Sequence, residues 1–183
     1  YFRWVDDWLD QEARPAAERQ AFIQRQTALI AGCYQGGLRL VPNPEEEMLV
    51  DLIRSSPDPT CGLGDYIRNL LAVMAFDAGR RGRPITQGEL RGYSDSLATG
   101  VAGAIHHFIG RSKPSSRAGV RHLVTAAHIT HMLRDTREDI EAGYFNAPIE
   151  YLESRHIDAH DVESPAYRDW VKSRVQLARR HFV

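Results

Sequence analysis

Apolar residues recur along this 183-residue chain at spacings of three and four, and no stretch alternates apolar with polar residues over the length of a strand. Spacings of three and four place apolar side chains on one face of an α-helix, whereas a half-buried strand needs a period of two. The sequence therefore predicts an all-α fold. No internal repeat or low-complexity tract divides the chain, so we expect a single helical domain over residues 1–183.

Glycine, proline and capping residues set the ends of the predicted helices. Asn43 and Pro44 open one helix, and Thr86 with Glu89 three residues on forms a capping box for another. The stretch GRRGRP at residues 79–84 predicts a solvated basic loop, with binding of phosphate or anionic lipid as the alternative. The predicted helices span residues 1–12, 16–34, 44–55, 63–78, 86–110 and 117–142, and a last one begins at Pro165.

Composition excludes several classes of protein. Hydrophobic residues make up 43% and charged residues 26%, which is ordinary for a globular protein with a core. The net charge of −1 gives no electrostatic basis for binding nucleic acid, which usually requires a basic face. The cysteines, Cys33 and Cys61, lack metal-ligand spacing, so we expect free thiols in a reducing cytoplasm. No apolar run is long enough to span a bilayer, and any membrane association is expected to be peripheral, through an apolar substrate.

The opening segment, YFRWVDDWLD, carries a first acidic motif. Asp6 and Asp10 are four residues apart and share a helix face with Arg3, whereas Asp7 is rotated from Asp6 by about 100°. The remaining residues are mostly aromatic or aliphatic, so the acids are expected to line a semi-buried wall, where clustered carboxylates need a cation. Magnesium suits such a wall because it is a hard ion that prefers oxygen ligands. The alternative is an ordinary solvated helix face.

A second acidic motif lies in the segment HMLRDTREDI, residues 131–140. Its two aspartates are four apart and share a helix face. Two histidines precede them at three- and four-residue spacing, which gives one stripe of His128, His131, Asp135 and Asp139. The alternative is a surface charge network, such as Arg134 with Glu138.

Two such motifs in one all-α chain favour a metal-binding site more strongly than either motif does alone. Two acidic walls that face each other across a helical bundle would hold several magnesium ions. These ions would bind a diphosphate, withdraw electrons from it and stabilise it as it leaves. The pair of motifs therefore predicts an ionisation site for allylic diphosphates.

Three segments together resemble the squalene/phytoene synthase family of trans-isoprenyl diphosphate synthases. YFRWVDDWLD resembles the family's Y-x-R-x-x-D-D-x-x-D, and HMLRDTRED resembles its N-I-L-R-D-x-x-E-D, followed by a turn at Gly143 and Pro148. Between them, ELRGYSDSLA at residues 89–98 resembles the family's E-L-x-x-Y-x-x-x-V-A-G. The resemblance spans about residues 1–150.

The resemblance implies a fold and an activity. The fold is the isoprenoid synthase type of helical bundle around a central cavity. The activity is a prenyltransferase reaction that condenses two allylic prenyl diphosphates of the farnesyl or geranylgeranyl type head to head, as in carotenoid or hopanoid biosynthesis. The first diphosphate ionises to an allylic cation, the double bond of the second attacks it, and a cyclopropyl intermediate forms. Magnesium is the implied cofactor.

The resemblance also implies roles for individual residues. The catalytic residues are Tyr93, Asp6, Asp10, Asp135 and Asp139. The four aspartates would hold magnesium, with His131 as a further metal ligand. Substrate-binding residues are Arg3, Asp7, His128 and Arg134. Tyr93 matches the tyrosine expected to assist proton removal or to stabilise a carbocation, a role that suits an aromatic ring; the alternative is plain helix packing.

The chain departs from the family pattern at Thr99, His128, His131 and Tyr144. Thr99 stands in place of the glycine of V-A-G, and Tyr144 in place of an arginine in the turn after the second motif. The two histidines replace Gln and Asn, and a histidine suits magnesium less well than an amide oxygen. The family's N-terminal diphosphate-binding segment and its C-terminal helices have no counterpart, so we expect a bundle that lacks them.

Two other functions stay open. The first is another class I terpenoid synthase, either a head-to-tail synthase or a cyclase, with the same use of metal. The second is a non-catalytic homologue that binds lipid or a partner, which the four departures favour. The segment around Tyr93 and the LRDxxED form of the second motif favour head-to-head condensation. The sequence determines neither the chain length of the substrate nor the oligomeric state.

Overall fold

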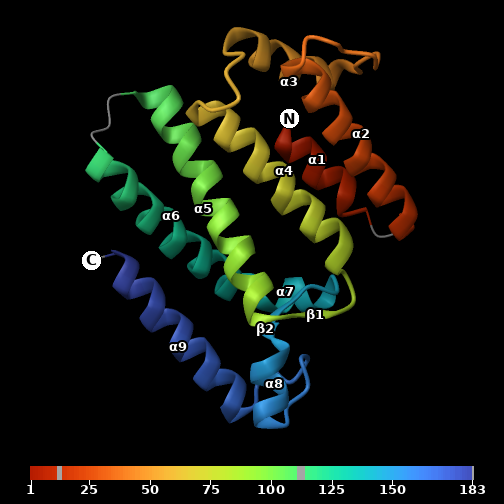
Figure 1. The fold of residues 1–183 in the computed structure, drawn as a ribbon. Coiled ribbons are helices and arrows are strands. Elements are labelled where there is room, and N and C mark those ends of the chain that lie inside the picture. Colours follow the sequence, from red (N-terminus) through yellow and green to blue (C-terminus); the bar gives the residue numbers. More distant parts are fainter. Residues whose placement is uncertain (12–13, 111–113, 183) are drawn as a thin grey trace. The chain divides into compact units, whose positions relative to one another are not determined.

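A computed structural model describes residues 1–11, 14–110 and 114–182, with the side chains of residues 114–117 left out. Apart from one short pair of strands, the regular elements of the described residues are all helices, which confirms the all-α prediction (Figure 1). The elements are α1 (Phe2–Leu9), α2 (Ala16–Tyr34), α3 (Pro44–Ser55), α4 (Gly62–Arg80), β1 (Pro84–Ile85), α5 (Gln87–Ile109), α6 (Pro114–Arg134), α7 (Thr136–Glu141), β2 (Phe145–Pro148), α8 (Ile149–Arg155) and α9 (Pro165–Phe182).

The chain forms two compact units. The first unit comprises Tyr1–Gly79 and Thr99–Arg111, and the second comprises Arg80–Ala98 and Ser112–Val183. Helix α5 contributes its first half to the second unit and its second half to the first. The single domain over residues 1–183 stays a prediction.

The first unit buries a row of aliphatic side chains from α1 to α4. Helix α1 enters this core through Phe2, Val5 and Leu9, which are spaced three and four apart. The residue that precedes α1 is bound to α2 as well, because the hydroxyl of Tyr1 donates a 2.8 Å hydrogen bond to the side-chain oxygen of Gln26. These contacts fix the orientation of α1 and therefore the direction in which its aspartates point.

Helices α4 and α5 approach each other closely within the first unit through glycines. A Cβ at Gly103 would lie 2.6 Å from the carbonyl oxygen of Gly62, and one at Gly100 would lie 2.5 Å from a methyl group of Leu70. The backbone of Gly62 therefore excludes a side chain at Gly103, whereas a side chain at Gly100 would require Leu70 to move. Gly100 directly follows Thr99, so the chain keeps a small residue against α4 one position after the family's glycine.

The second unit is organised around a short parallel pair of strands that the sequence did not predict. Strand β1 pairs with β2, with Pro84 opposite Phe145 and Ile85 opposite Pro148. Next to the pair, the backbone N–H of Gly82 donates a 2.8 Å hydrogen bond to the carbonyl of Gly143. An apolar cluster packs under β2, α8 and α9, and its buried members are Phe145, Ala147, Leu152, Ala159, Tyr167 and Trp170.

Three predicted boundaries differ from the structure. The basic loop predicted at residues 79–84 is confirmed only at residues 81–83, because α4 continues to Arg80, whose side chain is only 5% exposed, and β1 begins at Pro84. The predicted helix over residues 117–142 begins earlier, at Pro114, and is interrupted at Asp135, which separates α6 from α7. Helix α8 was not predicted. The end of the first predicted helix, Glu12, lies outside the described residues.

The interruption at Asp135 is small. Asp135 has φ −90° and ψ 5°, yet its N–H still donates to the carbonyl of His131, and the N–H of Asp139 donates to the carbonyl of Asp135. Helical hydrogen bonding therefore continues across the junction. None of the helices in the described part of the chain combines the length and apolarity needed to cross a bilayer.

A fully buried carboxylate, Glu46, holds α2 against α3. Arg25 donates two hydrogen bonds to it, at 2.7 and 2.6 Å, and Gln26 donates a third at 2.9 Å. The backbone N–H of Asn43 donates a fourth, while the Asn43 side chain accepts from the N–H of Glu46, which completes a capping box. Burial alone would raise the pKa of the Glu46 carboxyl, but these donors together hold it below its usual value.

We expect Glu46→Ala to lower the free energy of unfolding by about 3 kcal/mol, because it leaves the Arg25 and Gln26 donors without their acceptor. Urea unfolding followed by circular dichroism measures this change. Glu47→Ala is the control, since Glu47 occupies the next position of α3 and is exposed. Equal losses in the two variants would contradict the role assigned to Glu46.

Candidate functional site

The first acidic motif lies on α1 and at its C-cap, and its three aspartates differ in solvent exposure. The helix turns its apolar stripe into the core, which leaves Asp6 half-buried at the edge of the stripe and both Asp7 and Asp10 exposed. Arg3 pairs with Asp7 at 2.9 Å, and both side chains are largely exposed. Such a surface pair is weak, so the guanidinium of Arg3 can exchange to another anion at little cost.

Asp6 is a half-buried carboxyl close to other acidic side chains. Burial raises the pKa of its carboxyl to about 6, and the negative charges of Asp10 and Asp77 add to the effect. Arg3 offsets only part of this increase, and Asp7 adds to it. Carboxylates that crowd together in a partly desolvated place are stabilised by a cation, and their oxygen atoms are the donors that magnesium prefers.

Asp77 was missed by the sequence reasoning. It lies on α4, about seventy positions along the chain from Asp6, and no acidic motif surrounds it. Only the packing of α4 against α1 within the first unit brings its charge to Asp6. In the parts of the chain that the structure describes, no group of three or more His, Cys, Asp or Glu side chains is arranged to hold a metal ion.

The second acidic motif holds its two aspartates differently. Asp135 accepts two hydrogen bonds from Arg134, at 2.5 and 2.8 Å, which lower the pKa of its carboxyl. Arg134 is mostly exposed, so this pair too can exchange. Asp139 instead accepts a 2.7 Å hydrogen bond from the side-chain amide of Asn146 in β2.

Asn146 is itself held by a buried arginine. Its side-chain oxygen accepts a 3.0 Å hydrogen bond from Arg80, and the side chains of Asn146 and Arg80 are only 4% and 5% exposed. The guanidinium of Arg80 lies over two aromatic rings, 4.9 Å from the centroid of Tyr144 and 5.3 Å from that of Tyr93. The hydrogen bonds from Arg80 to Asn146 and from Asn146 to Asp139 together fix the orientation of the Asp139 carboxylate.

Tyr93 lies beside His128, with 5.3 Å between the ring centroids. His128 is buried, which lowers the pKa of its imidazole to about 4, helped by the positive charges of Arg174, His131 and Arg80. The ring is therefore neutral at neutral pH, and its Nε2 makes no hydrogen bond within the described residues. His131, one turn further along α6, is exposed.

The structure thus connects some of the predicted site residues. In the second unit, the guanidinium of Arg80 contacts the ring of Tyr93 and donates a hydrogen bond to Asn146. Asn146 in turn donates a hydrogen bond to Asp139, so Arg80 connects the two predicted site residues. Asn146 was not predicted as a site residue, and Arg80 was noted only within the basic segment at residues 79–84, for which binding of phosphate or anionic lipid was the alternative. Asp6 and Asp10 belong to the first unit, and Asp135 and Asp139 to the second. That all four meet around one diphosphate stays a prediction.

We expect the imidazole of His128 to stay unprotonated as the pH falls from 6.5, its ordinary pKa, to about 4. An unfolded chain takes up this proton near pH 6.5, so the residue lowers the stability of the fold progressively across that range. Imidazole ¹⁵N NMR, assigned with a His128→Gln variant, measures the titration. A midpoint near 6.5 would show that the ring is hydrated rather than buried.

Comparison with known proteins gives the chain its family. No curated protein matches it at a significant level. A family model described as squalene/phytoene synthase, however, matches residues 1–183, the whole of the sequence. The match includes both aspartate motifs and the segment around Tyr93. The chain belongs to the squalene/phytoene synthase family.

Proposed function

We propose that this protein condenses two allylic prenyl diphosphates of the farnesyl or geranylgeranyl type head to head, with magnesium assisting the departure of diphosphate. The family is one of prenyltransferases of isoprenoid biosynthesis, so a transferase is the class that membership supports. Hydrocarbon precursors of carotenoids or hopanoids are the corresponding products. The apolar chain of such a substrate partitions into bilayers, so peripheral association with a membrane surface is part of the proposal.

The observation that carries the proposal is the crowding of carboxylates at Asp6. Burial, and then the charges of Asp10 and Asp77, raise the pKa of the Asp6 carboxyl to about 6, and Arg3 compensates only in part. A divalent ion would relieve this repulsion and bind a diphosphate on its open side. Asp6 and Asp10 would hold ions from the first unit, and Asp135 and Asp139 from the second, with His131 as a further ligand.

The arginines next to the two motifs suit diphosphate binding. Arg3 and Arg134 each pair with an exposed or partly exposed aspartate of their own motif. An ion on Asp135 would free the guanidinium of Arg134, and the exposed pair of Arg3 with Asp7 is weak enough for Arg3 to exchange. Both guanidinium groups can then bind oxygen atoms of the leaving diphosphate, for which their planar geometry is well suited. The two residues would therefore move from a carboxylate partner to a phosphate partner as substrate and metal bind.

Tyr93 and His128 suit the proton transfer that the reaction requires. The bond from C1 of one substrate to its diphosphate breaks with its electrons on oxygen, and the double bond of the second substrate attacks the cation. Closure of the cyclopropane then releases one proton. His128 is neutral at neutral pH and lies against Tyr93, so the pair can accept that proton.

We expect the protein to convert farnesyl or geranylgeranyl diphosphate into a C30 or C40 product when magnesium is present, and to be inactive in EDTA. Asp6→Asn and Asp139→Asn should each lower kcat by about a hundredfold or more, since each removes a charge that holds an ion. Product analysis by mass spectrometry tests this. A shorter or cyclic product would assign the protein to another class of terpenoid synthase. Saturable lipid binding without turnover would mean a non-catalytic homologue.

We further expect Asn146→Asp to raise the magnesium concentration that gives half-maximal activity by about 10- to 100-fold, because the residue orients Asp139 without touching the ion. The aspartate keeps an acceptor for Arg80 but has no donor for Asp139 and repels it. Asn146→Leu, which loses both bonds, should have at least as large an effect. If Asn146 served only to pair with Arg80, the Asp variant would keep the magnesium dependence of the unchanged protein.

A further inference from the structure

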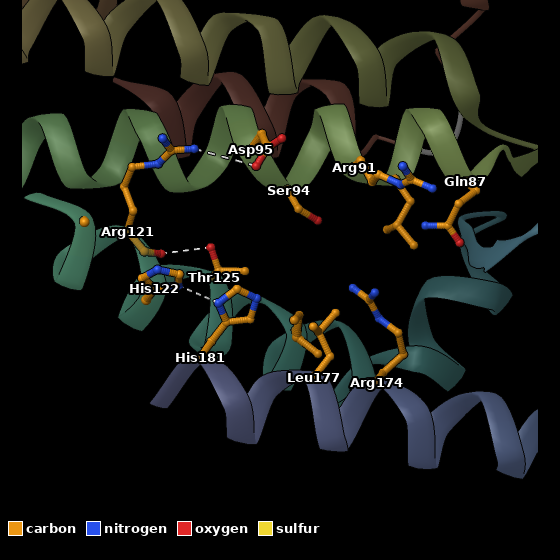
Figure 2. Close-up of a pocket in the computed structure, with 13 residues that line it drawn as sticks. Gln87, Arg91, Ser94, Asp95, Arg121, His122, Thr125, Arg174, Leu177 and His181 are labelled. Carbon is orange, nitrogen blue, oxygen red and sulfur yellow. Dashed lines mark hydrogen bonds and ion pairs between the residues drawn. The ribbon is translucent and has the colours of Figure 1, made fainter. Parts of the chain in front are cut away.

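A cavity of about 440 Å³ lies within the second unit, between the first half of α5 and the helices α6 and α9 (Figure 2). None of its lining residues belongs to either aspartate motif. Three arginines line it, namely Arg91 from α5, Arg121 from α6 and Arg174 from α9. Asp95 is the one carboxylate in the described lining, so the cavity carries two net positive charges with its histidines neutral.

Arg174 is the lining residue that most strongly indicates an anion in this cavity. Its side chain is largely withdrawn from water, and burial lowers the pKa of its guanidinium. Within the part of the chain that the structure describes, it makes neither an ion pair nor a hydrogen bond. Figure 2 shows it reaching from α9 toward α5, where Arg91 also lies. A desolvated cation without a counter-charge is costly, which favours an anion at this place.

Polar groups around Arg174 complete a site for an anion. The hydroxyl of Ser94 points from α5 toward α6 and α9, and it is buried without a hydrogen-bond partner among the described residues (Figure 2). At the other end, the Nδ1 atoms of His122 and His181 lie 2.8 Å apart, so one ring donates to the other. Arg121 is only loosely engaged, at 3.7 Å from the exposed Asp95. Each group can donate to an oxyanion.

The floor of the cavity is apolar. Leu90, Ile129 and Leu177 contribute to it, one from each of the three helices. An apolar floor beneath several guanidinium groups suits a ligand with a phosphate head and a small apolar body, and the volume is within the range of small-molecule sites. Arginine is well matched to such a head because its planar fork binds two phosphate oxygens at once.

We propose that this cavity binds a small molecule bearing a phosphate or diphosphate group, through Arg174, Arg91 and Ser94, and that it does so without a divalent metal. The site goes beyond the proposed condensation, in which diphosphate is held by ions on carboxylates. Its chemistry fits either inorganic diphosphate or an organic diphosphate whose apolar part lies on the floor.

Isothermal titration calorimetry of the whole chain in EDTA tests the proposal, with inorganic diphosphate in one arm and geranyl diphosphate in the other. Without divalent ions the aspartate motifs repel a diphosphate, so EDTA suppresses binding there, and the variants described next assign any saturable heat to the cavity. We expect saturable binding in at least one arm. Tighter binding of geranyl diphosphate identifies an organic occupant and equal affinity an inorganic one, and both results support the site.

Variants locate the binding. Arg174→Met should raise Kd by about tenfold or more, and Ser94→Ala should raise it to a smaller extent. Arg179→Met is the matched control: it removes the same charge from an exposed position of α9 outside the cavity, and Kd should stay within about twofold. Thermal unfolding without ligand should show Arg174→Met to be at least as stable as the unchanged chain, because it removes an unpaired desolvated charge.

Two results would overturn the proposal. One is the absence of saturable binding of both diphosphates in EDTA, and the other is an equal loss of affinity in Arg174→Met and Arg179→Met. Neither result bears on the proposed condensation, which is measured by product formation in the presence of magnesium. The two assignments can therefore fail independently.

Discussion

Burial of the guanidinium of Arg80 is the constraint on which much of the second unit depends. A charge withdrawn from water needs hydrogen bonds and polarisable neighbours, and here they come from two other segments, α5 and residues 144–146. The side-chain oxygen of Asn146 in β2 accepts a hydrogen bond from it, and the ring centroids of Tyr93 in α5 and Tyr144 before β2 lie 5.3 and 4.9 Å away. One cation thereby links the end of α4 to α5 and to the short strand pair, and its orientation reaches Asp139 through Asn146.

The two acidic motifs are stabilised in opposite ways, although their sequences are alike. Asp139 is held by donors, and Asp135 is paired with its own neighbour Arg134. Asp6, by contrast, lies among further carboxylates with only partial compensation. Ion binding would therefore relieve repulsion at the first motif and displace an existing arginine at the second. An exposed ion pair costs little to break, so both motifs are compatible with the same ligand.

The chain offers two kinds of environment for a phosphate group. The aspartate motifs carry negative charge and can accept a diphosphate only through metal ions. The cavity between α5, α6 and α9 carries positive charge and Arg174, which has no ion pair among the described residues, so the anion site proposed there would need no metal ion. Two of the departures from the family pattern have a place in the second unit: His128 is a neutral buried ring against Tyr93, and the ring of Tyr144 lies 4.9 Å from the guanidinium of Arg80.

The sequence by itself determined what depends on near neighbours in the chain. Helix α2 was predicted at Ala16–Tyr34, and α3 begins where Asn43 and Glu46 form a capping box, because propensity and caps act within a few residues. The four-residue spacing of Asp6 and Asp10 likewise required only a helix. Only the tertiary structure decided that Asp77 reaches Asp6, that Arg80 is buried rather than solvated, and that Asn146 orients Asp139. Each of these contacts joins separate elements of the fold, and no local pattern encodes which distant side chain will fill a given place in a packed core.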